Sequence, residues 1–126
     1  MANQPTTENA TICPVVESQE ITPWAHLLWL EAPAIARQAK PGQFVMVYCG
    51  PDTTLRRPLS LHRIDRENGC IGLLFNPVGK GTKWLAAQEA GEKVEVMGPL
   101  GNGYQINPES KKVLLVSGKI GIAPLH

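Results

Sequence analysis

Short apolar segments separated by turn-forming residues are the feature that most limits what this chain can fold into. Its 126 residues include 12 glycines and 11 prolines, above the usual combined share of about 12%. The apolar residues lie between these turn formers in short runs, many of which alternate with polar residues. Alternation of this kind is typical of strands that are buried on one face. The pattern indicates a mainly β domain and argues against a plain helical bundle.

Seven segments are predicted to be regular before the last part of the chain. Asn68-Gly69 is a hairpin signal between two of them. We predict one short helix over residues 83–89, and a glycine-rich loop over 98–103. The predicted antiparallel strands cover residues 11–21, 24–30, 44–49, 57–64, 70–75 and 92–97.

A continuous apolar run, Val113–Val116, then differs from the alternating strands before it. Such a run is typical of a parallel strand that is buried on both faces. It leads into Gly118-Lys119-Ile120-Gly121, where a nucleotide-binding unit would place its phosphate loop. We therefore expect a flexible N-terminus over 1–10, a β domain over 11–108, and the first strand of a truncated α/β domain over 109–126.

Charge and hydropathy exclude several classes of protein. The formal net charge of +1 argues against nucleic-acid binding by bulk electrostatics. The N-terminus has no basic residues and no apolar core, so no signal peptide is expected. No apolar run approaches the ~18 residues of a membrane span. A cytoplasmic protein is the default expectation.

The three cysteines do not predict a metal site. Cys13, Cys49 and Cys70 are widely spaced and form no C-x-x-C pair, which argues against zinc or a disulfide framework. Cys49 ends an apolar run, and we expect it to be a small buried hydrophobe.

Two motifs have the chemistry of an anion site. Arg57 offers a planar guanidinium suited to bidentate contact with phosphate, and Pro58 stiffens the segment that carries it. Ser60 can place a hydroxyl toward the same ligand. In the second motif, Gly81 and Thr82 stand at the start of the predicted helix, where backbone amides can bind phosphate. Thr82 would be either the N-cap or a hydroxyl donor to phosphate. Each motif alone is more often a surface residue or a plain helix cap.

The order of the motifs is more specific than any one of them. In that order, the chain resembles the N-terminal part of the ferredoxin–NADP reductase-like superfamily. Within it, the chain is similar to the electron-transfer subunits of class 1B dihydroorotate dehydrogenases. The stretches that carry the resemblance are 41–47 (PGQFVMV), 55–62 (LRRPLSLH), 78–85 (VGKGTKWL), 98–104 (GPLGNGY) and 116–125 (VSGKIGIAPL).

The resemblance implies a six-stranded antiparallel Greek-key β-barrel that holds FAD, followed by an α/β domain that binds NAD. Arg57, Gly81 and Thr82 would bind the FAD pyrophosphate. Pro58 and Leu59 would lie along the flavin, and Ser60 would sit near the reactive edge of the isoalloxazine. Main-chain groups of Leu74, Phe75 and Asn76 would also contact the cofactor.

The implied function is electron transfer from NADH through FAD to a [2Fe–2S] centre, and then to a catalytic dihydroorotate dehydrogenase subunit in pyrimidine biosynthesis. No side chain is expected to act as an acid–base catalyst. The sequence departs from the family at Lys119, where a glycine is usual, and it lacks the cysteine cluster that binds iron and sulfur. The NAD and [2Fe–2S] sites are therefore expected to be absent or incomplete here. The alternative is a non-catalytic β-barrel binding module, or an inactive fragment without flavin.

Overall fold

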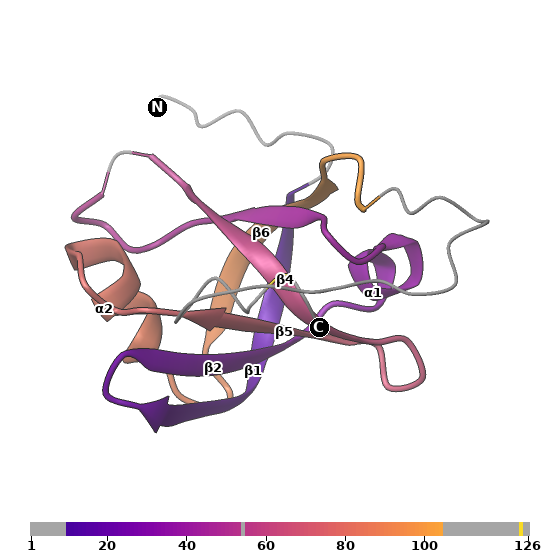
Figure 1. Ribbon diagram of the computed structural model, residues 1–126. Helices are drawn as coiled ribbons and strands as arrows, with labels where there is room; N and C mark the ends of the chain where they lie inside the picture. The colour runs from indigo at the N-terminus through magenta and orange to yellow at the C-terminus, as the bar shows by residue number, and fades with distance from the viewer. Residues whose placement is uncertain (1–9, 54, 105–123, 125–126) are drawn as a thin grey trace, which may run out of the picture.

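The alternating segments form six strands, and turn-forming residues separate them as the sequence predicts (Figure 1). The computed structural model describes residues 10–53, 55–104 and 124. The strand predicted at 113–116, the loop at 118–121 and residues 1–9 of the predicted N-terminal segment lie outside these residues. The elements are β1 (Ala10–Thr22), β2 (Ala25–Glu31), α1 (Pro33–Gln38), β3 (Phe44–Val47), β4 (Arg57–Asp65), β5 (Cys70–Phe75), α2 (Lys80–Ala86) and β6 (Lys93–Leu100).

The strands close into a barrel in the order β1-β2-β5-β4-β3-β6. Every neighbouring pair is antiparallel, including β6 with β1 and β6 with β3. Strands β3, β4 and β5 are neighbours in chain order, and β6 returns through the connection that contains α2 to lie beside β3, which is the order of a Greek key. The predicted fold, a six-stranded antiparallel Greek-key barrel, is confirmed.

The interior of the barrel is filled by the inward-facing residues of all six strands. In β3, for example, Val45 and Val47 are fully buried while Phe44 and Met46 are only half-buried. Cys49 is also buried, as the sequence predicts. The largest fully buried side chains of the described residues are Leu28, Leu30, Ile35, Ile71, Leu73, Leu85, Val45, Val47, Val94, Val96, Cys13 and Cys49.

The structure has two helices where the sequence predicts one. The missed helix, α1, begins with Pro33, which fits the first helical position because proline has no backbone N–H and an N–H at that position would have no partner within the helix. The predicted helix at 83–89 is real but begins earlier, at Lys80, and ends at Ala86. The two helices lie at opposite ends of the barrel (Figure 1). Neither has the length or hydropathy that a membrane-spanning helix needs.

The loop predicted at 98–103 is also partly wrong, because β6 continues through Leu100 and pairs it with Phe44. Gly98 is needed there for a close approach to β3. A Cβ at Gly98 would lie 2.9 Å from Cγ1 of Val45, and its φ of +153° is one that residues with a side chain rarely adopt. The hairpin predicted at Asn68-Gly69 is confirmed, with Gly69 at a φ of +68°.

Truncating a core side chain should destabilise the barrel strongly. Leu28 is completely buried, so Leu28→Ala should lower the free energy of unfolding by about 2–5 kcal/mol. Leu55 is 77% exposed, and the same truncation there should change the free energy by no more than about 0.5 kcal/mol. Urea denaturation of both variants measures the difference. Equal losses would contradict the assignment of Leu28 to the core.

A histidine makes the stability of the barrel depend on pH. His26 Nε2 lies 2.7 Å from Ser18 Oγ, and its ring packs against Phe75. Burial lowers the pKa of His26 below its ordinary value of 6.5, and the Glu20 carboxylate opposes this in part. The unfolded chain therefore binds the proton more tightly.

His26 should accordingly stabilise the fold in full above pH 6.5, and this stability should be lost as the pH falls through the lowered pKa. We expect the wild type to lose more stability than His26→Gln between about pH 7.5 and about pH 5. Urea denaturation at each pH measures both. Parallel curves for the two proteins would show that His26 does not contribute.

Candidate functional site

The two predicted anion-binding motifs meet at one end of the barrel. Arg57 is the first residue of β4, and Gly81 lies in the first turn of α2. The Arg57 Nε atom lies 3.6 Å from the position that a Cβ at Gly81 would take. The guanidinium thus stands against the helix start, although 24 positions separate the two residues in the sequence.

Arg57 is exposed, and it makes no ion pair with another described residue. Its backbone and its charge both act on the buried thiol of Cys49. Burial raises the pKa of Cys49, and the Arg57 charge and a hydrogen bond from the Arg57 backbone lower it in part. Cys49 therefore remains a neutral thiol and does not neutralise the positive charge of Arg57.

The start of α2 is shaped by a glycine pair and a threonine. Gly79 is the N-cap, so the interpretation of Thr82 as the N-cap is wrong. Thr82 is instead the third helical residue, and its Oγ1 accepts a hydrogen bond from the Gly79 N–H at 3.1 Å. The backbone N–H groups of the first turn have no partners within a helix and can face an anion.

Gly81 leaves no room for a side chain. A Cβ there would lie 2.9 Å from Cys49 Cβ and 3.4 Å from Thr53 Cγ2. The helix therefore approaches the connection between β3 and β4 closely only because residue 81 is glycine. The same connection packs on the next turn of the helix, where a Cβ at Gly50 would meet the Trp84 ring at 2.7 Å. The ring of Tyr48 meets Trp84 edge to face, with 5.8 Å between the ring centroids.

The remaining predicted residues lie on the strands beside this end. Pro58, Leu59 and Ser60 follow Arg57 on β4, where Leu59 packs against the core and Ser60 is half-buried. β4 and β5 pair through Leu61 and Leu73. Because the strands are antiparallel, the start of β4 and the end of β5 lead to the same end of the barrel.

Residues 74–76 stand at that end of β5, but their side chains differ in exposure. Phe75 is buried in the core against His26, so only its main chain can face a ligand. Leu74 and Asn76 are half-buried. The Asn76 carbonyl accepts a hydrogen bond from the Val78 N–H at 2.8 Å, which begins the turn into α2.

One feature of this region was not found from the sequence. Arg56, the neighbour of Arg57, forms an ion pair with Glu95 of β6. Both side chains are half-buried, and Nε of Arg56 is buried with no hydrogen-bond partner among the described residues. The partners are 39 positions apart, so no local pattern could have paired them.

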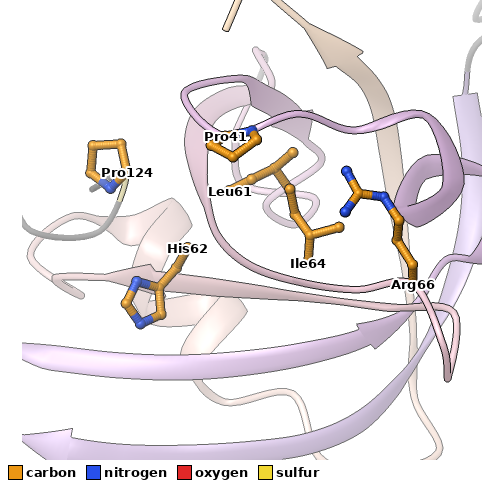
Figure 2. A pocket seen from close by; sticks show the side chains of 6 residues that line it. All are labelled: Pro41, Leu61, His62, Ile64, Arg66 and Pro124. Atoms are coloured by element: carbon orange, nitrogen blue, oxygen red, sulfur yellow. The ribbon is translucent and has the colours of Figure 1, made fainter. Parts of the chain in front are cut away.

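Two hollows on the described surface lie elsewhere. The first is lined by Pro41, Leu61, His62, Ile64, Arg66 and Pro124, and measures about 130 Å³. Figure 2 shows Pro124 and His62 at one end of it and Arg66 at the other. The second, of about 450 Å³, is lined by Trp29 and residues 63–67 at the opposite end of β4 from Arg57. The first is smaller than the ~300–1,000 Å³ usual for a ligand site.

Metal-binding side chains do not gather in the described part of the chain. No group of three or more histidine, cysteine or acidic residues there could hold an ion. Cys13, Cys49 and Cys70 are all free thiols. Burial raises the pKa of Cys13 to about 11, so this thiol is also neutral.

The close contact at Gly81 predicts that a methyl group added at this position lowers the stability of the fold. Gly81→Ala should lower the free energy of unfolding by about 1–3 kcal/mol, because Cys49 and Thr53 must move. A Cβ at Gly79 would meet nothing within 4 Å, and Gly79→Ala should cost less than about 1 kcal/mol, through weaker capping alone. Urea denaturation measures both. A Gly81→Ala protein as stable as Gly79→Ala would contradict the packing described here.

Comparison with known proteins connects this barrel with electron-transfer proteins. No protein-family model matches the sequence. A curated relative from Desulforamulus reducens, described as the electron transfer subunit of dihydroorotate dehydrogenase B (NAD(+)), is 47% identical over 107 residues. The match covers 83% of this chain and 41% of the relative. The chain thus spans less than half the length of the curated relative it matches.

Solved structures agree with the sequence comparison. An NADH-dependent reduced ferredoxin–NADP oxidoreductase, studied for flavin-based electron bifurcation, matches with a TM-score of 0.69 and 28% identity. The match covers 75% of this chain and 34% of that structure. Phthalate dioxygenase reductase has the same fold, with a TM-score of 0.75 at 21% identity over 94% of this chain and 38% of that one. By sequence, the chain belongs to the family of the dihydroorotate dehydrogenase B electron-transfer subunits.

Proposed function

We propose that this barrel binds FAD and is the flavin domain of an electron-transfer subunit. The observation that carries the proposal is the position of Arg57 against the start of α2. A guanidinium that has no ion pair with another described residue, beside a helix start whose first backbone amides the helix itself cannot pair, suits the two phosphates of the cofactor. The relatives are named as electron transfer subunits, which favours this function over a non-catalytic binding module.

The residues present fit a pyrophosphate in shape as well as in charge. Glycine at position 81 removes the side chain that would otherwise stand between the helix backbone and Arg57. Arg57 would bind the phosphate oxygens through its guanidinium, and Gly81 and Thr82 would bind them through their backbone N–H groups. The Thr82 hydroxyl already bonds to Gly79, so its own contribution is to hold the helix start in shape.

The strands would hold the ring system. Pro58 and Leu59 would lie along the isoalloxazine, with Ser60 near its reactive edge. Leu74, Phe75 and Asn76 would contribute main-chain contacts, since the Phe75 side chain is turned into the core. FAD supplies the redox chemistry when bound, and the protein's part is to bind it, orient it and set its surroundings. No side chain of the barrel need move a proton for this role.

The rest of the electron path lies beyond the barrel. We propose that the complete protein takes electrons from NADH and passes them through FAD and a [2Fe–2S] centre to a catalytic dihydroorotate dehydrogenase subunit, in the cytoplasm. The name of the curated relative supports this partner and NAD as the co-substrate. Electron transfer from pyridine nucleotides to [2Fe–2S] is what the structure of phthalate dioxygenase reductase describes.

Removing the guanidinium should weaken FAD binding selectively. Arg57→Ala should reduce the affinity for FAD by about 1.5–3 kcal/mol, the usual size of a hydrogen bond to a charged group. Riboflavin has no phosphate, so its affinity should stay the same. Arg63→Ala is the matched control, because Arg63 is exposed farther along β4. Calorimetric titration of each variant with each flavin gives the four comparisons.

FAD binding by the wild-type protein is the first test of the proposed function. It should bind FAD and take on the visible absorption of a bound flavin. A wild-type protein that binds no FAD would make the flavin proposal wrong. If Arg57→Ala lowered the affinities for FAD and riboflavin equally, FAD would still be the ligand, but the assignment of Arg57 to the pyrophosphate would be wrong.

A further inference from the structure

One residue of β6, Glu95, holds both ends of the connection between β3 and β4. At the first end, the Tyr48 N–H donates to the Glu95 backbone carbonyl at 3.0 Å. At the other end, Nη2 of Arg56 lies 2.5 Å from Oε1 of Glu95. Tyr48 directly follows β3 and Arg56 directly precedes β4. The carboxylate is therefore the side-chain anchor of the residue next to Arg57.

The described part of this connection rests on α2 between its two ends. The Thr53 N–H and hydroxyl both donate to the Gly50 carbonyl, at 3.2 Å and 3.0 Å. Gly50 packs on Trp84, and Thr53 lies close to Gly81. A displacement at Arg56 would therefore change how the connection meets the helix start, and with it the direction of Arg57.

The ion pair also separates the roles of the two adjacent arginines. Arg56 and Glu95 are about equally buried, with 23% and 26% of their side chains exposed, and their charges offset each other. Arg57 has no such partner among the described residues. At this end of the barrel, the Arg56 cation is therefore paired with Glu95, whereas the Arg57 cation is left for a ligand.

We propose that Arg56 and Glu95 are positioning residues, which aim Arg57 at the pyrophosphate of the flavin. The proposal rests on the proposed FAD function, because it concerns how that site is held. It makes a prediction opposite in sign to simple electrostatics. Removing the negative charge of Glu95 should strengthen the binding of an anion if charge alone matters. If Glu95 acts by holding Arg56, its removal should weaken that binding.

The test is a titration of Glu95→Gln with FAD and with riboflavin. We expect a loss of about 3- to 10-fold in FAD affinity, within the range of a half-buried ion pair, and an unchanged affinity for riboflavin. Arg56→Gln breaks the same pair from the other side and should show the same selectivity. Glu17→Gln, which removes an exposed carboxylate from β1, should leave both affinities unchanged. An unchanged or stronger FAD affinity in Glu95→Gln would overturn the proposal.

A double variant shows whether Glu95 acts through Arg57. In an Arg57→Ala background, Glu95→Gln should cause no further loss of FAD affinity, because nothing remains to be aimed. A further loss of the full 3- to 10-fold would mean that Glu95 acts independently, which contradicts positioning.

Amide hydrogen exchange of the flavin-free protein separates this proposal from the proposed function. Exchange in residues 50–57 should be faster in Glu95→Gln than in the wild type, while exchange in β2 stays the same. This result would support the anchoring role even if the wild type bound no FAD, an outcome that would make the proposed function wrong. Unchanged exchange in residues 50–57 would overturn the anchoring role whatever the flavin titration shows.

Discussion

Closure of the barrel by β6 is the constraint on which the rest of the structure depends. This strand pairs with β1 through Val94 and with β3 through Val96, and both valines are buried. Each of the six described strands consequently has a neighbour on both sides, so none presents an open edge. Glu95 lies between the two valines, and strand alternation turns it away from the core. The packing that closes the barrel thus also places the carboxylate that Arg56 meets.

The charges at the α2 end of the barrel follow from this arrangement. A helix start carries a partial positive charge of about half a unit, which solvent screens, and α2 has only seven residues. By itself it is a weak reason to expect an anion site. The full charge of Arg57 stands against it and lacks a carboxylate partner among the described residues. In the proposed site, the helix start and Arg57 would bind the same anion together, which neither would do well alone.

Much of the fold could be predicted because short-range sequence patterns indicate its strands and turns. Alternation, β-branched and aromatic composition, and flanking glycine or proline residues together identified all six strands, and Asn68-Gly69 identified the β4–β5 hairpin. The helix α1 was missed because Pro33 ends an extended segment and begins a helix equally well. The end of β6 was missed because Gly98 and Pro99 usually mark a turn. There the glycine instead permits contact with Val45, which only tertiary structure reveals.

The candidate site could be predicted in part. Its residue types could be found in the two motifs, since arginine, glycine and threonine have the chemistry that phosphate needs. Their proximity could not, because it requires the barrel to bring β4 beside α2. The FAD contacts of these residues remain predictions.

Glycine shows most clearly why a motif does not describe its own role. Gly79 and Gly81 occur two residues apart in one motif, yet a side chain at Gly79 would meet nothing, whereas one at Gly81 would meet Cys49. Only Gly81 is therefore required by packing, and the requirement comes from a residue 32 positions earlier. That contact brings the helix start close to Arg57, and the proposed flavin site depends on this closeness. The excess of glycine that indicates a β fold thus includes one residue, Gly81, whose task is to bring a helix onto the barrel.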